Sequence, residues 1–215
     1  MNKLFFVFSL IALSSVFALG QNDHKKGEFF VGYSNGQIDA GIEGFTSVDT
    51  GIGNRTSFHG FNTSAVYNFN RYVGVKGDFS GVYNSTRFSF PVTTGATTQT
   101  VTFDTDNSLY NVLGGIQVKD NAVDKKFKPF AHALAGIGHA KVKVGGVNCT
   151  TTTVINCGQI LSESETGLAA AFGGGLDIRL NDRFDLRAFQ VDYNPIKFDE
   201  STTHNFRFGI GIVIK

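Results

Sequence analysis

The stretch Asn205-Phe206-Arg207-Phe208-Gly209-Ile210-Gly211-Ile212-Val213-Ile214 alternates with a period of two, which is the pattern of a β-strand. One face of this strand is apolar, whereas the other carries Asn205, Arg207 and two glycines. A strand in a soluble sheet turns its apolar face towards a protein core. Because the opposite face holds an arginine and the chain opens with a secretion signal, the apolar face is predicted to point outward into lipid.

The secretion signal occupies residues 1–20. Lys3 precedes an apolar run from Leu4 to Leu13, and Ala18-Leu19-Gly20 is a small-x-small cleavage site. The run is shorter than the roughly 20 residues of a spanning helix, so cleavage is predicted and residues 21–215 form the mature domain. Without Lys3, 18 basic residues balance 18 acidic ones, and this neutrality gives no electrostatic reason to expect a nucleic-acid partner.

Eight runs with a period of two follow the signal, and most are near the 9–11 residues that cross a bilayer when tilted. Eight is also the smallest usual strand count of a closed outer-membrane barrel. The fold class is therefore predicted as all-β, an eight-stranded antiparallel up-and-down transmembrane β-barrel. The predicted strands are 28–35, 58–69, 72–83, 108–118, 129–142, 167–180, 183–193 and 204–214.

The connections between the runs differ in length in a regular way. Long polar loops are predicted at 36–57, 84–107 and 143–166, whereas tight turns are predicted at Asn70-Arg71 and Asn181-Asp182. Long loops at one end and shorter turns at the other are typical of outer-membrane barrels.

Charges recur on the face that the barrel would enclose. The residues predicted to share the interior are Lys76, Asp78, Asp177, Arg179 and Arg207. Buried charges are costly unless they are paired, and two acids among three bases can largely neutralise each other. Two strands are ambiguous. The two faces of Phe130–Ile137 cannot be told apart. Enclosing Gln190 and Asp192 sends Arg187 outward, where it would snorkel to the headgroups unless a β-bulge resets the register.

The two cysteines, Cys149 and Cys157, lie close together in a threonine-rich stretch. In an exported chain such a pair predicts a disulfide. No CxxC spacing and no histidine accompany them, so a metal or redox site is disfavoured.

The order of three segments resembles a known family, the small eight-stranded outer-membrane β-barrels that include the membrane domain of outer membrane protein A and the opacity-type adhesins. The segments are Tyr72-Val73-Gly74-Val75-Lys76-Gly77-Asp78-Phe79-Ser80, Gly173-Gly174-Gly175-Leu176-Asp177 and Gln190-Val191-Asp192-Tyr193. The resemblance implies a location in the outer membrane, surface-exposed loops, outer-membrane lipid as the surroundings and insertion by the outer-membrane assembly machinery. Many such chains end in an aromatic residue, whereas this one ends in Val213-Ile214-Lys215.

No catalytic, metal or cofactor site is predicted. His132 and His139 are seven residues apart and would face opposite sides of one strand, and the glycine clusters open no helix that could bind phosphate. Ser57 and His59 share a face, but a hydrolase would also need a carboxylate that orients the histidine.

The leading functional hypothesis is a non-enzymatic outer-membrane scaffold whose long extracellular loops serve envelope integrity or surface interaction with a ligand of unknown identity. The loop at 84–107 and the loop around the cysteines are the predicted contact regions. Two alternatives stay open at this point: a secreted soluble barrel that binds a small apolar ligand, and an outer-membrane enzyme that modifies lipid A through His59.

Overall fold

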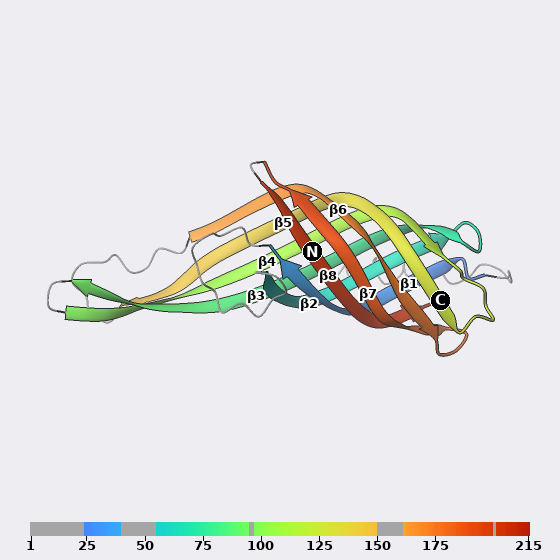
Figure 1. Cartoon of the computed structure of the whole chain (residues 1–215), viewed down its shortest axis with the longest axis horizontal. Helices are drawn as coiled ribbons and strands as arrows, with labels where there is room; N and C mark the ends of the chain where they lie inside the picture. Colours follow the sequence, from blue (N-terminus) through green and yellow to red (C-terminus); the bar gives the residue numbers. More distant parts are fainter. Residues whose placement is uncertain (1–23, 40–54, 95–96, 150–160, 200) are drawn as a thin grey trace, which may run out of the picture.

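The computed structural model describes residues 24–39, 55–94, 97–149, 161–199 and 201–215, which form eight antiparallel strands closed into a barrel (Figure 1). Each strand pairs with its neighbours in sequence, and β1 closes the barrel against β8. The described residues contain no helix of the length and apolarity that crossing a membrane requires. The strands are β1 (Gly27–Ile38), β2 (Thr56–Asn68), β3 (Val73–Thr94), β4 (Thr97–Lys119), β5 (Phe127–Cys149), β6 (Leu161–Arg179), β7 (Phe184–Lys197) and β8 (Thr202–Ile214).

The strands are strongly staggered around the barrel. A row of directly paired residues that leaves β6 at Gly174 returns to β6 at Ser164, ten residues away, by way of Val191, Phe208, Asn35, His59, Tyr83, Ser108 and Lys141. For eight strands, a stagger of ten corresponds to a tilt of roughly 40° from the barrel axis.

One end of the barrel, called the turn end below, carries the tight turns and the carboxyl terminus. The side chain of Asn70 accepts hydrogen bonds from the backbone N–H groups of Tyr72 and Val73 at 2.8 and 2.9 Å, and Asn181 caps the turn between β6 and β7 in the same way. Asparagine favours turns because its short side chain can satisfy nearby backbone donors. Both turns occur where the sequence predicted them.

At the opposite end, β3 and β4 continue as a hairpin well beyond the rest of the wall (Figure 1). The prediction of a loop at 84–107 was wrong, since residues 84–94 and 97–107 belong to these two strands and are called the arm below. Threonine and phenylalanine both favour strands, and Phe88 stacks on its cross-strand partner Phe103 with 5.2 Å between ring centroids. Likewise β5 extends to Cys149 and β6 begins at Leu161, so much of the predicted loop 143–166 is strand.

Large apolar side chains cover the outside of the barrel, whereas charged and amide side chains are buried inside. The exposed apolar residues include Val31, Val75, Phe79, Val112, Ile116, Ile137, Leu168, Phe172, Phe189, Val191 and Ile210. This arrangement is the reverse of a soluble barrel, and it makes the alternative of a secreted soluble protein wrong.

Candidate functional site

Four of the five charges predicted for the interior, namely Lys76, Asp78, Asp177 and Arg207, are at most 4% exposed and lie inside the barrel. Arg179 does not join them. It is the last residue of β6, and its guanidinium donates to Asp182 in the following turn. Because the strand ends there, the side chain reaches the turn rather than the enclosed space.

Arg207 is the centre of one cluster of the interior network, the cluster that lies farther from the turn end. Its guanidinium donates to Asp78 at 2.7 Å, to Ser80 at 2.8 Å and to Asp192 at 2.7 and 2.9 Å. Lys76 lies 3.5 Å from Asp78. These contacts connect β3, β7 and β8 across the lumen, with opposite charges adjacent at every step.

A second cluster lies nearer the turn end, around Asp177. This carboxylate accepts from Lys119 at 2.8 Å and from two nitrogens of Arg187 at 2.8 and 3.1 Å. Lys119 also donates to Glu28 at 2.6 Å. The Arg187 guanidinium stands 4.2 Å from the ring centroids of both Phe30 and Phe130, so aromatic faces and a carboxylate share its charge.

Gln190 joins the two clusters. Its amide oxygen accepts from Arg187 at 2.8 Å, and its amide nitrogen donates to Asp192 at 2.7 Å. Arg187 and Gln190 both face inward because the register between β7 and β8 shifts between them. Of the two explanations that the sequence left open for Arg187, the β-bulge is therefore the right one.

Charge balance holds for the buried residues as a group. In the described part of the chain, five acids are buried together with five lysines and arginines, apart from His132, and the acids are Glu28, Asp78, Asp177, Asp185 and Asp192. The bases are Lys76, Lys119, Lys128, Arg187 and Arg207. Sequence reasoning missed Lys119 and Lys128 because it placed them in a charged connection, whereas they are inward-facing positions at the ends of β4 and β5.

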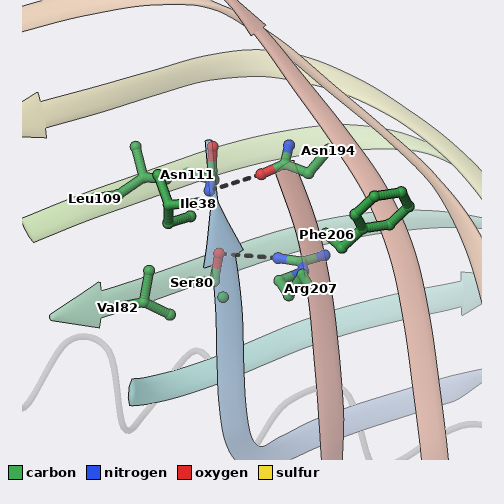
Figure 2. Close-up of a pocket in the computed structure, with 9 residues that line it drawn as sticks. Ile38, Ser80, Val82, Leu109, Asn111, Asn194, Phe206 and Arg207 are labelled. Atoms are coloured by element: carbon green, nitrogen blue, oxygen red, sulfur yellow. Dashed lines mark hydrogen bonds between the residues drawn. The ribbon is translucent and has the colours of Figure 1, made fainter. Parts of the chain in front are cut away.

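An apolar cluster fills much of the lumen nearer the arm, beside the buried amides Asn111, Asn194 and Asn205. The cluster comprises Phe58, Val82, Leu109, Leu113, Leu134, Ala169, Ala171, Ile196 and Phe198. A cavity of about 10 Å³ lies where this cluster meets the polar network, and that volume holds about one water molecule. Figure 2 shows the boundary: the bonded pairs Ser80–Arg207 and Asn111–Asn194 stand beside Leu109 and Val82. The cavity is far too small for an organic ligand.

The side chains required for a hydrolase at His59 are not assembled among the described residues. Ser57 accepts from Asn35 at 2.8 Å and from Gln37 at 3.2 Å, whereas the Nδ1 atom of His59 is bonded to the hydroxyl of Tyr33. The ion pairs found within the described ranges give neither residue a carboxylate partner. In the same part of the chain no three His, Cys, Asp or Glu side chains gather into a metal site.

Aromatic residues mark both limits of the apolar wall. Tyr67, Phe69 and Tyr72 lie at the turn end, and Tyr83 and Tyr110 pack edge to face near the base of the arm. The eleven steps from Tyr72 to Tyr83, at about 3.3 Å each and a tilt of roughly 40°, span about 28 Å along the axis. This height agrees with the roughly 25 Å apolar band of outer-membrane barrels.

A closed eight-stranded barrel with an apolar wall and a charged interior defines a small barrel of the outer membrane. The family described as the outer membrane protein beta-barrel domain matches residues 8–213, and the chain belongs to this family. The protein accordingly resides in the outer membrane of a Gram-negative type of envelope.

Two solved structures of one protein show the same fold. Ail, the attachment invasion locus protein of Yersinia pestis, is 21% identical over 87% of this chain and 97% of its own, with a TM-score of 0.52. Its complex with the heparin analogue sucrose octasulfate gives 0.51 with the same identity and coverage. Neisserial surface protein A is 13% identical over 90% of this chain and 99% of its own, with a TM-score of 0.46. No curated protein matches the chain.

The predicted signal peptide lies outside the described residues, as do Cys157 and the side chain of Cys149. The cleavage site and the disulfide stay predictions.

Proposed function

We propose that this protein is a non-enzymatic, non-conducting scaffold that holds the arm rigidly above the outer membrane, where the arm contacts a partner outside the cell. Two observations together carry the proposal. Side chains fill the interior of the barrel, and β3 and β4 continue beyond the wall without a break in their pairing.

The interior supports a barrel that conducts no solute. Salt-bridged side chains cross one part of the lumen and the apolar cluster fills much of the rest. An ion that entered the apolar cluster would lose most of its water against hydrocarbon side chains, which is a large free-energy cost.

The arm supports a display role because cross-strand contacts stiffen it. Arg87 donates to both carboxylate oxygens of Asp104 at 2.7 and 3.2 Å, and Ser89 lies 3.1 Å from Thr102 through their hydroxyl oxygens. A preordered arm loses little conformational entropy on binding, and this favours recognition.

The charges on the arm indicate the kind of partner. On its outward face Arg87 stands against two acids, Asp104 and Asp106, so the described part of the arm has a net negative charge. Ail was solved with a heparin analogue, but a polyanion would find no excess of cations on this arm. A protein surface or an uncharged glycan fits the arm better.

Insertion by the outer-membrane assembly machinery belongs to the same proposal. A strand that entered lipid alone would expose unpaired N–H and C=O groups, so a barrel of this kind needs assistance until β1 meets β8.

The test compares the full chain with a variant in which residues 86–105 are replaced by Asn-Gly, which removes register-matched lengths of β3 and β4. Cells that display the full chain should adhere to epithelial monolayers above the vector background, and cells with the shortened chain should return to it. Both proteins should give no conductance steps in planar bilayers. Equal adherence of the two strains, or steady conductance by the full chain, would contradict the proposal.

A further inference from the structure

Three of the five histidines, namely His59 on β2, His139 on β5 and His204 on β8, lie on the outer surface of the barrel near the base of the arm. Each bonds through Nδ1 to a hydroxyl group on a neighbouring strand. The partners are Tyr33 for His59, Thr166 for His139 at 2.7 Å and Tyr193 for His204 at 2.5 Å. One arrangement therefore recurs at three places around the wall.

These histidines stand at one level of the membrane. A row of paired residues climbs by ten residues along the strands in one turn around the eight strands. A circuit that stays at one height must therefore shift by about 1.25 residues along the chain at each strand. Starting from His204, such a circuit passes within about two residues of His59, Tyr83, Tyr110 and His139. The tyrosines in this set mark the limit of the apolar wall, so the imidazoles lie where lipid headgroups begin.

The hydrogen bonds decide which ring nitrogen faces the lipid. A phenol hydroxyl is a better hydrogen-bond donor than acceptor, so Nδ1 of His59 accepts from Tyr33. The same role for Nδ1 in the other two pairs leaves the proton on Nε2, the distal atom of the ring. Stacking holds two of the rings in place, since the Tyr193 and His204 planes differ by 7° and those of Tyr33 and His59 by 29°.

Arg55 lies beside one of these rings. Its Nε atom donates to the backbone oxygen of His204 at 3.1 Å, and its guanidinium lies 4.9 Å from the ring centroid of Phe206. None of the ion pairs within the described ranges joins an acid to the three imidazoles. Within the described ranges the three imidazoles are therefore not committed to a carboxylate.

We propose that His59, His139 and His204 form a belt of Nε2–H donors that binds the phosphate groups of the glycolipid in the outer leaflet. Imidazoles with a fixed tautomer donate to phosphate oxygens with good geometry, and hydrogen bonds to charged acceptors are stronger than neutral ones. The belt would hold the surrounding lipids at a set height and fix the depth of the barrel.

The experiment uses the refolded full chain with ¹⁵N-labelled histidine in detergent micelles, titrated in separate arms with diphosphorylated lipid A, with dephosphorylated lipid A and with inorganic phosphate. Diphosphorylated lipid A should shift the Nε2 resonances of all three histidines, and the other two probes should not. Shifts of equal size with dephosphorylated lipid A would overturn the proposal, as would equal competition by inorganic phosphate.

Matched variants test the belt by affinity. The substitutions H59F, H139F and H204F keep an aromatic ring but remove the donor, and each should weaken retention of diphosphorylated lipid A about fivefold. H24F removes an imidazole at the turn end and should leave retention unchanged. Heat-modifiable migration on gels identifies the folded variants. Unchanged retention in the three single variants that fold would overturn the proposal even if the triple variant does not fold.

Discussion

Arg207 and Asp192 are joined across β8 and β7 by two hydrogen bonds to a single carboxylate oxygen, at 2.9 and 2.7 Å, in the middle of the enclosed space. Both side chains are at most 5% exposed. Removal of one partner leaves the other charge buried without compensation, which is far more costly than the loss of a surface ion pair.

We expect Asp192→Ala to lower the free energy of unfolding by about 3–5 kcal/mol. Arg179→Ala is the matched control, because Arg179 pairs with Asp182 outside the lumen and exposed pairs contribute at most about 1 kcal/mol. Urea unfolding in micelles, followed by circular dichroism, measures both. Equal losses in the two variants would contradict the description of the central network.

Arg187→Lys should also destabilise the barrel although it keeps the charge. Lysine cannot bond both oxygens of Asp177 and Gln190 together, nor stack flat between Phe30 and Phe130. A loss of about 2 kcal/mol in the same urea assay is expected from one charged hydrogen bond and the weakened cation–π contacts. A variant as stable as the wild type would show that the planar guanidinium is not required.

Leu113→Ala tests the apolar cluster of the lumen. Leu113 is 4% exposed and packs within the buried apolar cluster. Truncation should cost about 2–5 kcal/mol, since it removes buried methyl groups and leaves a void. Val112→Ala, on the lipid-facing side of the same strand, should cost clearly less because Val112 is 53% exposed to the surroundings. Similar losses at the two positions would contradict the assignment of faces on β4.

Two glycines distinguish the inside of the sheet from the outside. A Cβ atom on Gly115 would lie 2.1 Å from the backbone oxygen of Ala133, whereas a Cβ atom on Gly77 would meet nothing within 4 Å. Gly115→Ala should therefore reduce the folded fraction after refolding, and Gly77→Ala should leave it unchanged. Heat-modifiable migration on gels measures that fraction, and equal yields would contradict the close approach of β4 and β5.

Acid should act on the turn between β4 and β5 through Asp120. Hydrogen bonds from Arg71 and Lys125 hold the pKa of Asp120 well below its ordinary value of 3.8. A carboxylate with a depressed folded-state pKa adds stability that is present above its unfolded value and is lost as the pH falls towards the folded value. We expect the ¹³C carboxyl resonance of Asp120 to titrate below pH 3.8, and Arg71→Ala to move the midpoint upward. A midpoint that the variant leaves unchanged would contradict the role of Arg71.

The outline of the barrel was predictable because the pattern repeats along each strand. Arg207 opposite an apolar face indicated the inverted barrel, and Asn70 and Asn181 indicated the turns. The inward position of Arg187 was not predictable, since a bulge leaves no fixed mark in a local pattern and depends on how β7 meets its neighbours.

The arm and the apolar cluster of the lumen were missed for other reasons. Residues 84–107 are rich in threonine, serine and asparagine, and such a composition looks like a loop until the pairing of Phe88 with Phe103 is known. Leu109 and Leu113 lie inside while Val112 lies outside, so both faces of β4 are apolar and the alternation loses its contrast. A period of two in the sequence is visible only where the two faces of a strand differ in polarity. It cannot be detected where both faces are apolar.

The register of β3 with β4 continues without interruption from Val73↔Val118 at the turn end to Thr94↔Thr97 in the arm. A pull on the tip of the arm therefore acts along the strands and is shared by the bonds from β3 to β2 and from β4 to β5, all loaded in parallel. Bonds loaded in this shearing direction must break together, whereas those of a loosely attached loop would open one after another. For the proposed attachment, this geometry means that a pull along the arm is resisted by many backbone hydrogen bonds at once.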